Sequence, residues 1–426
     1  MAQVGFFGGG GVSNDNAGTI NIVNSTISGN SALPDPNFQS VIYGGGIRNS
    51  DSGRVYVTNS TIADNKGGQG ARIYMADSFV APVTLKNTIV SNNIGGNCNS
   101  YVTDGGNNLQ YPGTTCSNTI SSAGSKLGSQ VIAGTPAILF PLLPGSPAIN
   151  AGNNTVCAAA PISGVDQRGV IRPQGANCDI GAVEMNILTV NSIADTDDAS
   201  CDTIGNGTGN KDCTLREAIN AANISLGSFI YFNISGNGVK TISPASALPS
   251  LTKPVVIDGT TQSGASCGTS PANATLLIEI NGTNAGQNSS GLTFSGGTST
   301  IRGLVINHFG SNGINFNTKD NNLLECNFIG TNAAGNTAAV NGGDGILING
   351  SSNNILGQAN VVGSWNLISG NNGVGIRVIS GKSNIAASNW VGSNSSGTAT
   401  IRNQGGGIKI LTGGQLALSS GNKVKN

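Results

Sequence analysis

The sequence repeats itself at two long offsets, and a repeating chain has few folds open to it. The 21 residues from Phe328 to Ile348 align without a gap with those from Trp390 to Ile410, an offset of 62 residues. In the N-terminal part the offset is 35: the residues 9–12 and 24–27 recur as 44–47 and 59–62. A fixed period of this kind is typical of a solenoid, in which each repeat stacks on the next.

Short apolar segments lie between the Gly and Asn residues of these repeats. Segments such as Ile20-Asn21-Ile22-Val23 and Ile346-Leu347-Ile348 alternate between two faces, so one face can enter a core. Gly and Asn tolerate the left-handed backbone of tight corners, and stacked Asn side chains can form amide ladders. We therefore predict an all-β fold, a right-handed parallel β-helix, with three turns in 62 residues or about 21 residues per turn. An antiparallel sandwich is the alternative, and the ungapped offset counts against it.

The charge balance excludes some partners. The chain has 426 residues with 20 Lys+Arg and 20 Asp+Glu, so its formal net charge is zero. A nucleic-acid partner is not expected, because phosphate binding needs an excess of basic residues. Direct insertion into a membrane is not expected either, because the most apolar stretch, Ala137 to Leu143, is far shorter than a spanning helix.

The cysteines indicate an oxidising compartment. Their number is even and the chain has a single histidine, His308, which favours disulfides over a zinc site. Six cysteines form close pairs in the sequence and two remain that could pair across neighbouring strands: Cys98 with Cys116, Cys157 with Cys178, Cys201 with Cys213, and Cys267 with Cys326. Free buried thiols are the alternative, and the sequence by itself does not establish which cysteines are joined. We expect an extracellular or cell-surface location.

Two consecutive segments interrupt the repeat. From Leu143 the chain reads LPGSPAINAG, followed by Asp166-Gln167-Arg168-Gly169, Arg172-Pro173 and CDIGAVE ending at Glu184. This segment resembles the choice-of-anchor Q module, which stands near the C-terminal side of bacterial surface β-helices. Asn150 and Val183 depart from that pattern, where Asp and Tyr are expected.

The next segment contains LTVNSIADTDD from Leu188, then Cys201, Cys213 and TLREAINAAN from Thr214. It resembles the CSLREA domain, which opens many extracellular β-helix proteins, with Thr214 in place of Ser. The residues themselves predict a short helix, since Thr214 and Glu217 form a capping box and Leu215, Ala218, Ile219 and Ala222 share one face. Such a helix can cover the open end of a solenoid.

Together these segments predict four parts. Residues 1–142 are the C-terminal part of a first β-helix, 143–185 the end module, 186–250 the start segment with the capping α-helix, and 251–426 a second β-helix that ends in mid-coil. The chain therefore contains the tail of one solenoid and the head of another.

Catalysis would need two carboxylates facing one groove. The acids available in the second solenoid are Asp258, Glu279, Asp320, Glu325 and Asp344, with Arg302 as a partner. None recurs in the repeat, and nothing near His308 marks it as a base. Solvated surface acids are the simpler interpretation, and we predict that the chain is not an enzyme.

Two further polar groups are candidate sites. The run Asp195-Thr196-Asp197-Asp198 offers hard oxygen ligands, so Asp195, Asp197 and Asp198 are candidate calcium ligands, although a solvated loop beside a disulfide explains them better. No other cofactor is expected. Asp166, Arg168 and Arg172 can form a buried ion-pair network that holds the end module together.

The sequence therefore predicts a bacterial-type extracellular surface protein with a structural or adhesive role. The chain begins near a Gly9-Gly10-Gly11 coil and stops at GNKVKN, and open coil ends are templates for strand stacking, so we expect self-association head to tail or laterally, in filaments. The alternative, with equal weight, is that these ends are arbitrary boundaries of a piece of a longer chain. Surface polysaccharide is a further expected partner. The alternatives are a polysaccharide-degrading lyase or glycoside hydrolase and a glycan-binding module, the latter using exposed aromatic residues such as Trp365 and Trp390.

Overall fold

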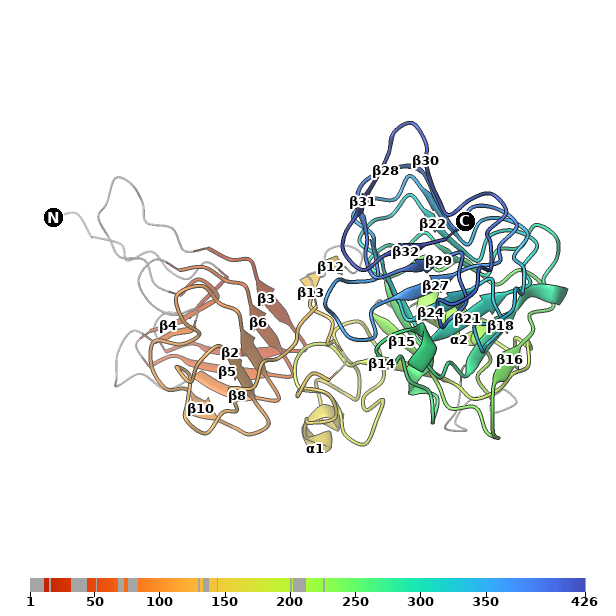
Figure 1. The fold of residues 1–426 in the computed structure, drawn as a ribbon. Coiled ribbons are helices and arrows are strands. Elements are labelled where there is room, and N and C mark those ends of the chain that lie inside the picture. The colour runs from red at the N-terminus through yellow and green to blue at the C-terminus, as the bar shows by residue number, and fades with distance from the viewer. Residues whose placement is uncertain are drawn as a thin grey trace. The chain divides into compact units, whose positions relative to one another are not determined.

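The computed structural model is shown in Figure 1. It describes residues 11–14, 17–31, 44–50, 52–67, 73–75, 83–128, 131–132, 138–143, 145–199, 201, 212–224 and 227–425. Gly9 and Gly10 of the predicted first coil lie outside these residues. The chain divides into two compact units, residues 1–186 (unit 1) and 187–426 (unit 2), and each is described by itself. The finer division at residues 142, 185 and 250 stays a prediction.

Unit 1 contains stacked parallel strands. They form three parallel sheets: β1 (Val12–Asn14), β4 (Ile47–Asn49) and β7 (Ile73–Met75); β2 (Thr19–Val23), β5 (Arg54–Thr58), β8 (Val83–Lys86) and β10 (Thr103–Asp104); and β3 (Thr26–Ser28), β6 (Thr61–Ala63), β9 (Ile89–Ser91) and β11 (Leu109–Tyr111). A short antiparallel pair, β12 (Val131–Ile132) and β13 (Ile138–Leu139), follows. Val12 pairs with Ile47 and Thr26 with Thr61, so the 35-residue offset joins neighbouring coils, as predicted.

Unit 2 is a longer parallel β-helix. One twelve-stranded sheet contains β14 (Asn186–Val190), β15 (Ser228–Phe232), β17 (Val255–Asp258), β19 (Leu292–Phe294), β20 (Thr300–Arg302), β22 (Ile314–Asn317), β23 (Leu323–Glu325), β25 (Ile346–Asn349), β26 (Ile355–Leu356), β28 (Ile376–Ala386), β30 (Ile408–Ile410) and β31 (Gly414–Leu418). A seven-stranded sheet contains β16 (Lys240–Ile242), β18 (Ile278–Asn281), β21 (Leu304–Asn307), β24 (Asn327–Ile329), β27 (Asn366–Ile368), β29 (Trp390–Val391) and β32 (Lys423–Val424). Three 3₁₀ turns, Gly259–Thr261, Pro271–Asn273 and Gly282–Asn284, lie between strands.

The larger sheet of unit 2 consists of two ladders joined by the long strand β28. The start of β28 pairs with β25 and β30, and its end pairs with β26 and β31. Each coil therefore contributes strands to three faces. These parallel ladders establish the predicted parallel β-helix.

The predicted coil length is wrong. Ile314, Ile346, Ile376 and Ile408 pair in succession, so neighbouring coils are offset by 32, 30 and 32 residues. Phe328 pairs with Leu367, which pairs with Trp390, so the 62-residue offset spans two coils of about 31 residues rather than three of about 21. The reason is that a coil contains three strands, and a similar loop returns only on every second coil.

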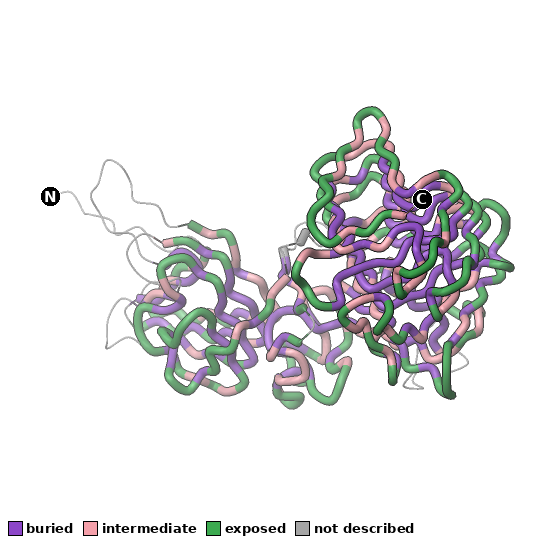
Figure 2. The backbone as a smooth tube through the Cα atoms, viewed as in Figure 1, coloured by how far each residue is buried: buried purple, intermediate pink, exposed green. Residues whose placement is uncertain are grey.

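Apolar columns fill the interior of each coil, where Figure 2 shows the buried residues. One column of unit 2 contains Ile257, Ile301, Leu324, Leu356 and Ala386, each fully buried and each paired with the next. Burying an aliphatic side chain of this size contributes about 1.5–3 kcal/mol. Since the side chains of a strand alternate, a shift of one residue would expose the whole column, so the columns fix the register.

Asn ladders occupy the corners of the coils, as predicted. In one of them the Nδ2 of Asn327 donates to the Oδ1 of Asn366 at 3.1 Å, Asn366 donates to Asn389 at 2.9 Å, and Asn389 donates to Asn422 at 3.3 Å. Asn366 also donates to the carbonyl of Leu324 at 2.9 Å. These amides satisfy buried backbone groups at the turns, where the strand ladder stops.

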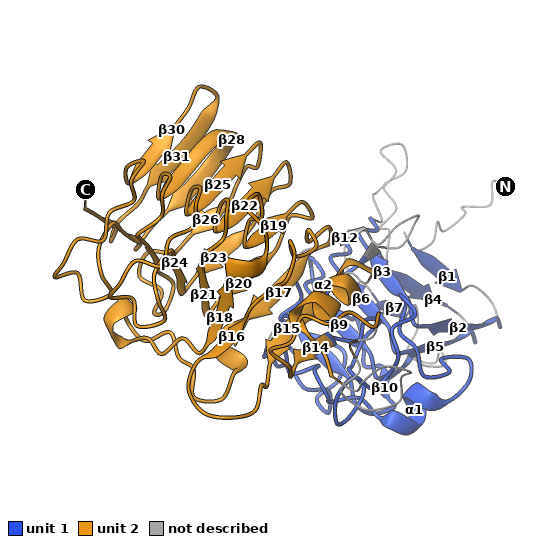
Figure 3. Cartoon of the chain, turned by 90° about the vertical axis from the view of Figure 1, so that its right-hand side faces the viewer, with its two compact units in different colours: residues 1–186 blue, residues 187–426 orange. Residues whose placement is uncertain are grey.

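The helix α2 (Leu215–Ile224) begins with the predicted capping box. The backbone N–H of Thr214 donates to Glu217 Oε2 at 2.7 Å, and that of Glu217 donates to Thr214 Oγ1 at 3.2 Å. Its apolar residues belong to the same buried cluster as Ile230 of β15, and Figure 3 shows α2 beside β15 within unit 2. The helix thus covers the core where the unit begins.

A second helix, α1 (Asn154–Ala158), corrects the prediction of a single helix. The side chain of Asn153 accepts hydrogen bonds from the N–H groups of Thr155 and Val156 and so caps it. An Asn at such a position is a common cap residue, which the sequence shows. The helix itself could not be recognised, because five residues are too few to show a helical period.

The predicted ion-pair network lies inside residues 143–186. Arg168 pairs with Asp166 at 2.7 Å, and Arg172 pairs with Glu184 at 3.1 Å. Arg172 also donates to the carbonyls of Asp179 and Gly181, at 2.9 and 2.8 Å. The carboxylates accept backbone N–H groups in turn, among them Glu184 N on Asp166 at 2.9 Å. A buried network in which most polar groups, though not the Nε of Arg172, have partners holds together a segment that contains few strands.

We predict that Asn366→Ala destabilises unit 2 by about 2–4 kcal/mol, because the Nδ2 and N–H of Asn327 lose their shared acceptor and the buried Oδ1 of Asn389 loses its donor. Chemical unfolding of the full chain measures the effect. Asn349→Ala is the matched control, since Asn349 is exposed and its truncation should change stability by less than about 0.5 kcal/mol. Equal losses in the two variants would contradict a stabilising role for the ladder.

The stability of unit 1 should fall as pH rises from about 5 to about 7.5. Burial raises the pKa of Glu184 to about 7, and the neighbouring Asp179 carboxylate adds to the rise. A raised pKa in the folded state stabilises most below the ordinary value of 4.5, and this contribution is lost as pH passes the folded value.

Calorimetric unfolding of the full chain at several pH values tests this prediction. Glu184→Gln removes the titrating group. The loss of unfolding free energy between pH 5 and 7.5, on the order of 1–3 kcal/mol in the unsubstituted chain, should therefore be smaller in this variant. An unchanged loss in this variant would assign the titration to another group.

Candidate functional site

Two similar loops stand on alternate coils of unit 2. The first covers residues 331–340 and the second 393–402, and an antiparallel bridge closes each, from Thr331 to Ala338 and from Ser393 to Thr400. They are equivalent under the 62-residue offset. Each follows a strand of the seven-stranded sheet, β24 or β29, and precedes the coil's next face.

In each loop, the side chain of one asparagine accepts backbone hydrogen bonds from the same loop. The Oδ1 of Asn332 accepts the N–H groups of Asn336 and Thr337, at 3.1 and 3.3 Å. The Oδ1 of Asn394 accepts the N–H of Ala399 at 3.0 Å. Gly335 and Gly397 have φ values of 64° and 71° at the equivalent turn, a conformation that costs Gly little. The loop shape therefore follows from residues that the repeat contains twice.

The two loops touch although a whole coil separates them. The N–H of Ser395 donates to the carbonyl of Gly335 at 2.7 Å, and its hydroxyl donates to that of Ala334 at 3.1 Å. The intervening coil makes only a short turn here, and its Gly370 N–H donates to the carbonyl of Ile401 at 3.1 Å. A short turn between two long loops leaves a hollow between them.

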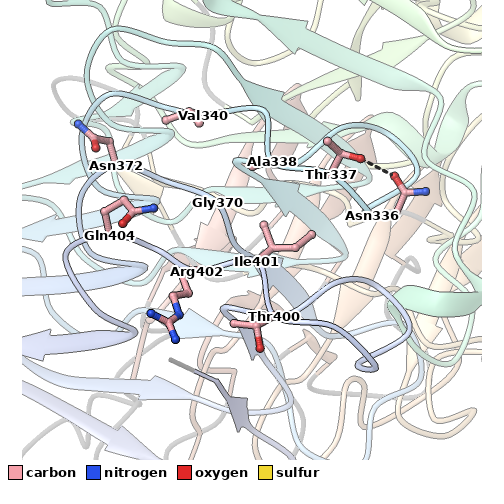
Figure 4. A pocket seen from close by; sticks show the side chains of 10 residues that line it. All are labelled: Asn336, Thr337, Ala338, Val340, Gly370, Asn372, Thr400, Ile401, Arg402 and Gln404. Atoms are coloured by element: carbon pink, nitrogen blue, oxygen red, sulfur yellow. Dashed lines mark hydrogen bonds between the residues drawn. The ribbon is translucent and has the colours of Figure 1, made fainter.

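This hollow is a pocket of about 520 Å³. Figure 4 shows its lining, which comes from both loops and the coil between them. The lining residues are Asn336, Thr337, Ala338, Val340, Gly370, Asn372, Thr400, Ile401, Arg402 and Gln404. Three amides, two hydroxyls and one guanidinium supply its polar groups, and none of the ten carries a carboxylate, imidazole or thiol.

An Asn ladder lies directly behind the pocket. Asn341 donates to Asn371 at 2.9 Å and Asn371 to Asn403 at 2.8 Å, and all three are buried. The lining residues Val340, Asn372 and Arg402 are their sequence neighbours. A rigid, satisfied ladder therefore fixes the backbone from which the pocket's side chains project.

Positive charge accumulates on the coils that hold the second loop. Residues 345–425 are all described and contain no Asp or Glu, whereas their basic residues are Arg377, Lys382, Arg402, Lys409, Lys423 and Lys425. Of these, Arg377 pairs with Asp344 at 2.6 Å, outside that range. Lys423 lies over the Trp390 ring at 3.8 Å, and Lys425 donates to the carbonyl of Gly397 at 2.6 Å. The zero net charge of the chain conceals this local excess.

None of the loop residues is among the sequence candidates. The signal was present, because the repeat aligns Asn332 with Asn394 and Gly335 with Gly397. What the sequence did not show is that a coil with only a short turn at this position lies between them. The predicted aromatic residues do not line the pocket: Trp365 is buried against Phe328, with ring centroids 5.8 Å apart, and Trp390 lies beneath Lys423.

Two of the five candidate acids share one arginine. Asp258, Arg302 and Glu325 stand in register on successive coils, and Arg302 lies 3.6 Å from Asp258 and 3.7 Å from Glu325. Burial, together with Asp258, raises the pKa of Tyr231, the preceding residue of this column, to about 12.

The other three acids have separate partners. Glu279 accepts from Thr241 and Asn307, Asp344 pairs with Arg377, and Asp320 accepts the N–H of Ser352. His308 is exposed. The structure therefore brings Asp258 and Glu325 to one arginine and leaves the remaining acids apart.

The candidate calcium ligands have different neighbours. Asp195 pairs with Arg216 at 2.8 Å, and Asp197 accepts from Asn220 at 2.9 Å. Asp198 lies with Asp212 and Glu217, whose carboxylate oxygens are within 4.8 Å of one another. Each of the three predicted ligands thus has different partners, and calcium binding stays a prediction.

All eight cysteines form disulfides in the pairs expected from the sequence: Cys98–Cys116, Cys157–Cys178, Cys201–Cys213 and Cys267–Cys326. Four disulfides indicate an oxidising compartment, so the protein is secreted or belongs to a cell envelope. Within the described ranges, the helices are too short or too polar to cross a bilayer.

No protein-family model and no curated protein matches this chain. Among solved structures, it is similar to a mutant of the periplasmic alginate epimerase AlgG, with 10% identity and a TM-score of 0.31 over 93% of this chain and 85% of that one. At these values the likeness assigns no activity to this chain. The resemblance to choice-of-anchor Q and CSLREA segments, and self-association of the chain, stay predictions.

The prediction that the chain is not an enzyme is nevertheless contradicted, because the similar structure is an enzyme. The sequence argument relied on acids that do not recur in the repeat. An active site has to occur only once on a solenoid, so the lack of recurrence was no evidence against catalysis.

Proposed function

We propose that this chain is the polysaccharide-binding part of a secreted or cell-envelope β-solenoid protein, with an adhesive role. The observation that carries the proposal is the pocket between the two stacked loops. Its amides, hydroxyls and exposed backbone groups match the mixed donor and acceptor pattern of sugar hydroxyls. A solenoid also offers a long surface, and a polymer can follow it beyond a single pocket.

The charge of the surrounding coils supports an acidic polysaccharide. Arg402 lines the pocket, and a guanidinium binds a carboxylate or sulfate group through two parallel hydrogen bonds. Residues 345–425 supply further cations and no competing carboxylate. A polymer with regularly spaced negative charges would gain from both features.

We predict that the full chain binds a polyuronate or sulfated polysaccharide more tightly than a neutral one, and that Arg402→Gln weakens the acidic ligand's binding about tenfold or more. Arg54→Gln is the matched control, since Arg54 is exposed on unit 1. Affinity electrophoresis and calorimetry measure both. Equal affinity of the two variants, or no binding to any polysaccharide, would contradict the proposal.

A second candidate function, cleavage of a polysaccharide, is supported by the stacked Asp258, Arg302 and Glu325. Two carboxylates on nearby coils are the minimum that glycosidic hydrolysis requires, and an arginine between them can orient an acidic sugar. The full chain should then release reducing ends or unsaturated sugars from an acidic polysaccharide.

Asp258→Asn and Glu325→Gln should each lower that release at least a hundredfold, whereas Asp320→Asn should not. If the unsubstituted chain releases no sugar product, the cleavage function is ruled out, whereas the proposal of polysaccharide binding still stands.

A further inference from the structure

A buried lysine stands apart from the two sites described so far. Lys240 begins β16 of unit 2 and pairs with Ile278, so its side chain starts at a core position and is 6% exposed. Lysine is rarely buried to this extent without a charged partner, because removing an ammonium from water is costly. The partners of its Nζ therefore decide how the charge is stabilised.

The ammonium of Lys240 has fewer hydrogen-bond acceptors than it has donors. The Nζ of Lys240 donates to the carbonyl of Asn237 at 3.0 Å. Among the described residues it has no carboxylate partner, in contrast to the buried Arg172, which pairs with Glu184. An ammonium has three donors, so two remain for another acceptor.

The acid on the paired strand β18 is engaged elsewhere. Glu279 is in register with Thr241, one residue from Lys240, and its two oxygens accept from Thr241 at 2.7 Å and from Asn307 at 2.8 Å. The positive charge of Lys240 is therefore not neutralised by this strand pair.

The loop 235–239 approaches the ammonium at Gly236 and Asn237. Gly236 and Gly238 have φ values of 92° and 71°, and a Cβ placed on Gly236 would lie 3.4 Å from the Nζ. The N–H groups of residues 235–239 donate no hydrogen bond to any described residue. Successive free N–H groups with left-handed residues form a concave anion-binding arrangement.

Together these groups line a pocket of about 310 Å³. Its walls include Asn233, Ser263 and Gln262, and the amide of Gln262 is locked by bonds of 2.8 and 2.9 Å to the backbone of Ile234. The wall at Gln262 is thus rigid and polar. The volume suits a small anion or the charged group of one sugar.

We propose that this pocket binds an oxyanion, held by the Lys240 ammonium and the N–H groups of the loop 235–239. The shared chemistry is a compact group with several negative oxygens: inorganic sulfate or phosphate, or the sulfate ester or carboxylate of an acidic sugar. This site is independent of the pocket at Arg402, because it uses other coils of unit 2.

Calorimetric titration of the full chain at constant ionic strength tests the proposal with three probes: sodium sulfate, glucuronate and a sulfated oligosaccharide. At least one should bind, and Lys240→Met should lose tenfold or more of that affinity while keeping the apolar stem of the side chain. Lys319→Met, at an exposed lysine of the same unit, should bind as the unsubstituted chain does.

The order of affinities identifies the source of the anion. Tighter binding of the sulfated oligosaccharide or glucuronate indicates a sugar, and tighter binding of sulfate indicates a free ion. Crystals of the unsubstituted chain grown with selenate give a readout that needs no variant, since anomalous density should lie within hydrogen-bond distance of Lys240 Nζ. No binding of any probe, equal affinity of Lys240→Met, or selenate density elsewhere only would overturn the proposal.

Discussion

Stacking of each coil on the next is the constraint from which the other features follow. A parallel strand pair places residue i of one coil over its partner in the next, so a position becomes a column. An apolar column such as Ile257, Ile301 and Leu324 gains from burial, but a corner leaves backbone groups unpaired. The Asn ladders satisfy these groups and repeat with the coils, because an amide both donates and accepts.

The same stacking creates the loop pocket. A loop that returns on every second coil is brought next to its copy, and the short turn of the coil between them leaves space. The Asn341–Asn371–Asn403 ladder fixes the floor of that space. A surface with few charged residues can therefore keep a well-defined pocket, because the hydrogen-bonded Asn ladder beneath it fixes the backbone.

The net charge of the chain is zero, but its charged residues are unevenly distributed along the fold. Inside residues 143–186 buried acids and arginines pair with one another, and on β17, β20 and β23 they alternate along a column. The coils after residue 344 have cations without acids, and Lys240 lies buried with a carbonyl as partner. Each excess of positive charge adjoins a pocket, which connects both proposals to anionic ligands.

The sequence by itself determined the solenoid, the capping box at Thr214 and Glu217, and an ion pair between Asp166 and Arg168, because each depends on residue types at short or repeated spacings. It suggested cysteine pairs without establishing their connectivity, and it did not indicate Glu184 as the partner of Arg172. It did not determine the coil length, since a 62-residue offset is equally compatible with two coils or three. Only the tertiary structure decided that Gly335 meets Ser395, that Asp258 and Glu325 share Arg302, and that Lys240 is buried. Those contacts depend on which coil lies over which, and short-range patterns do not encode that registration.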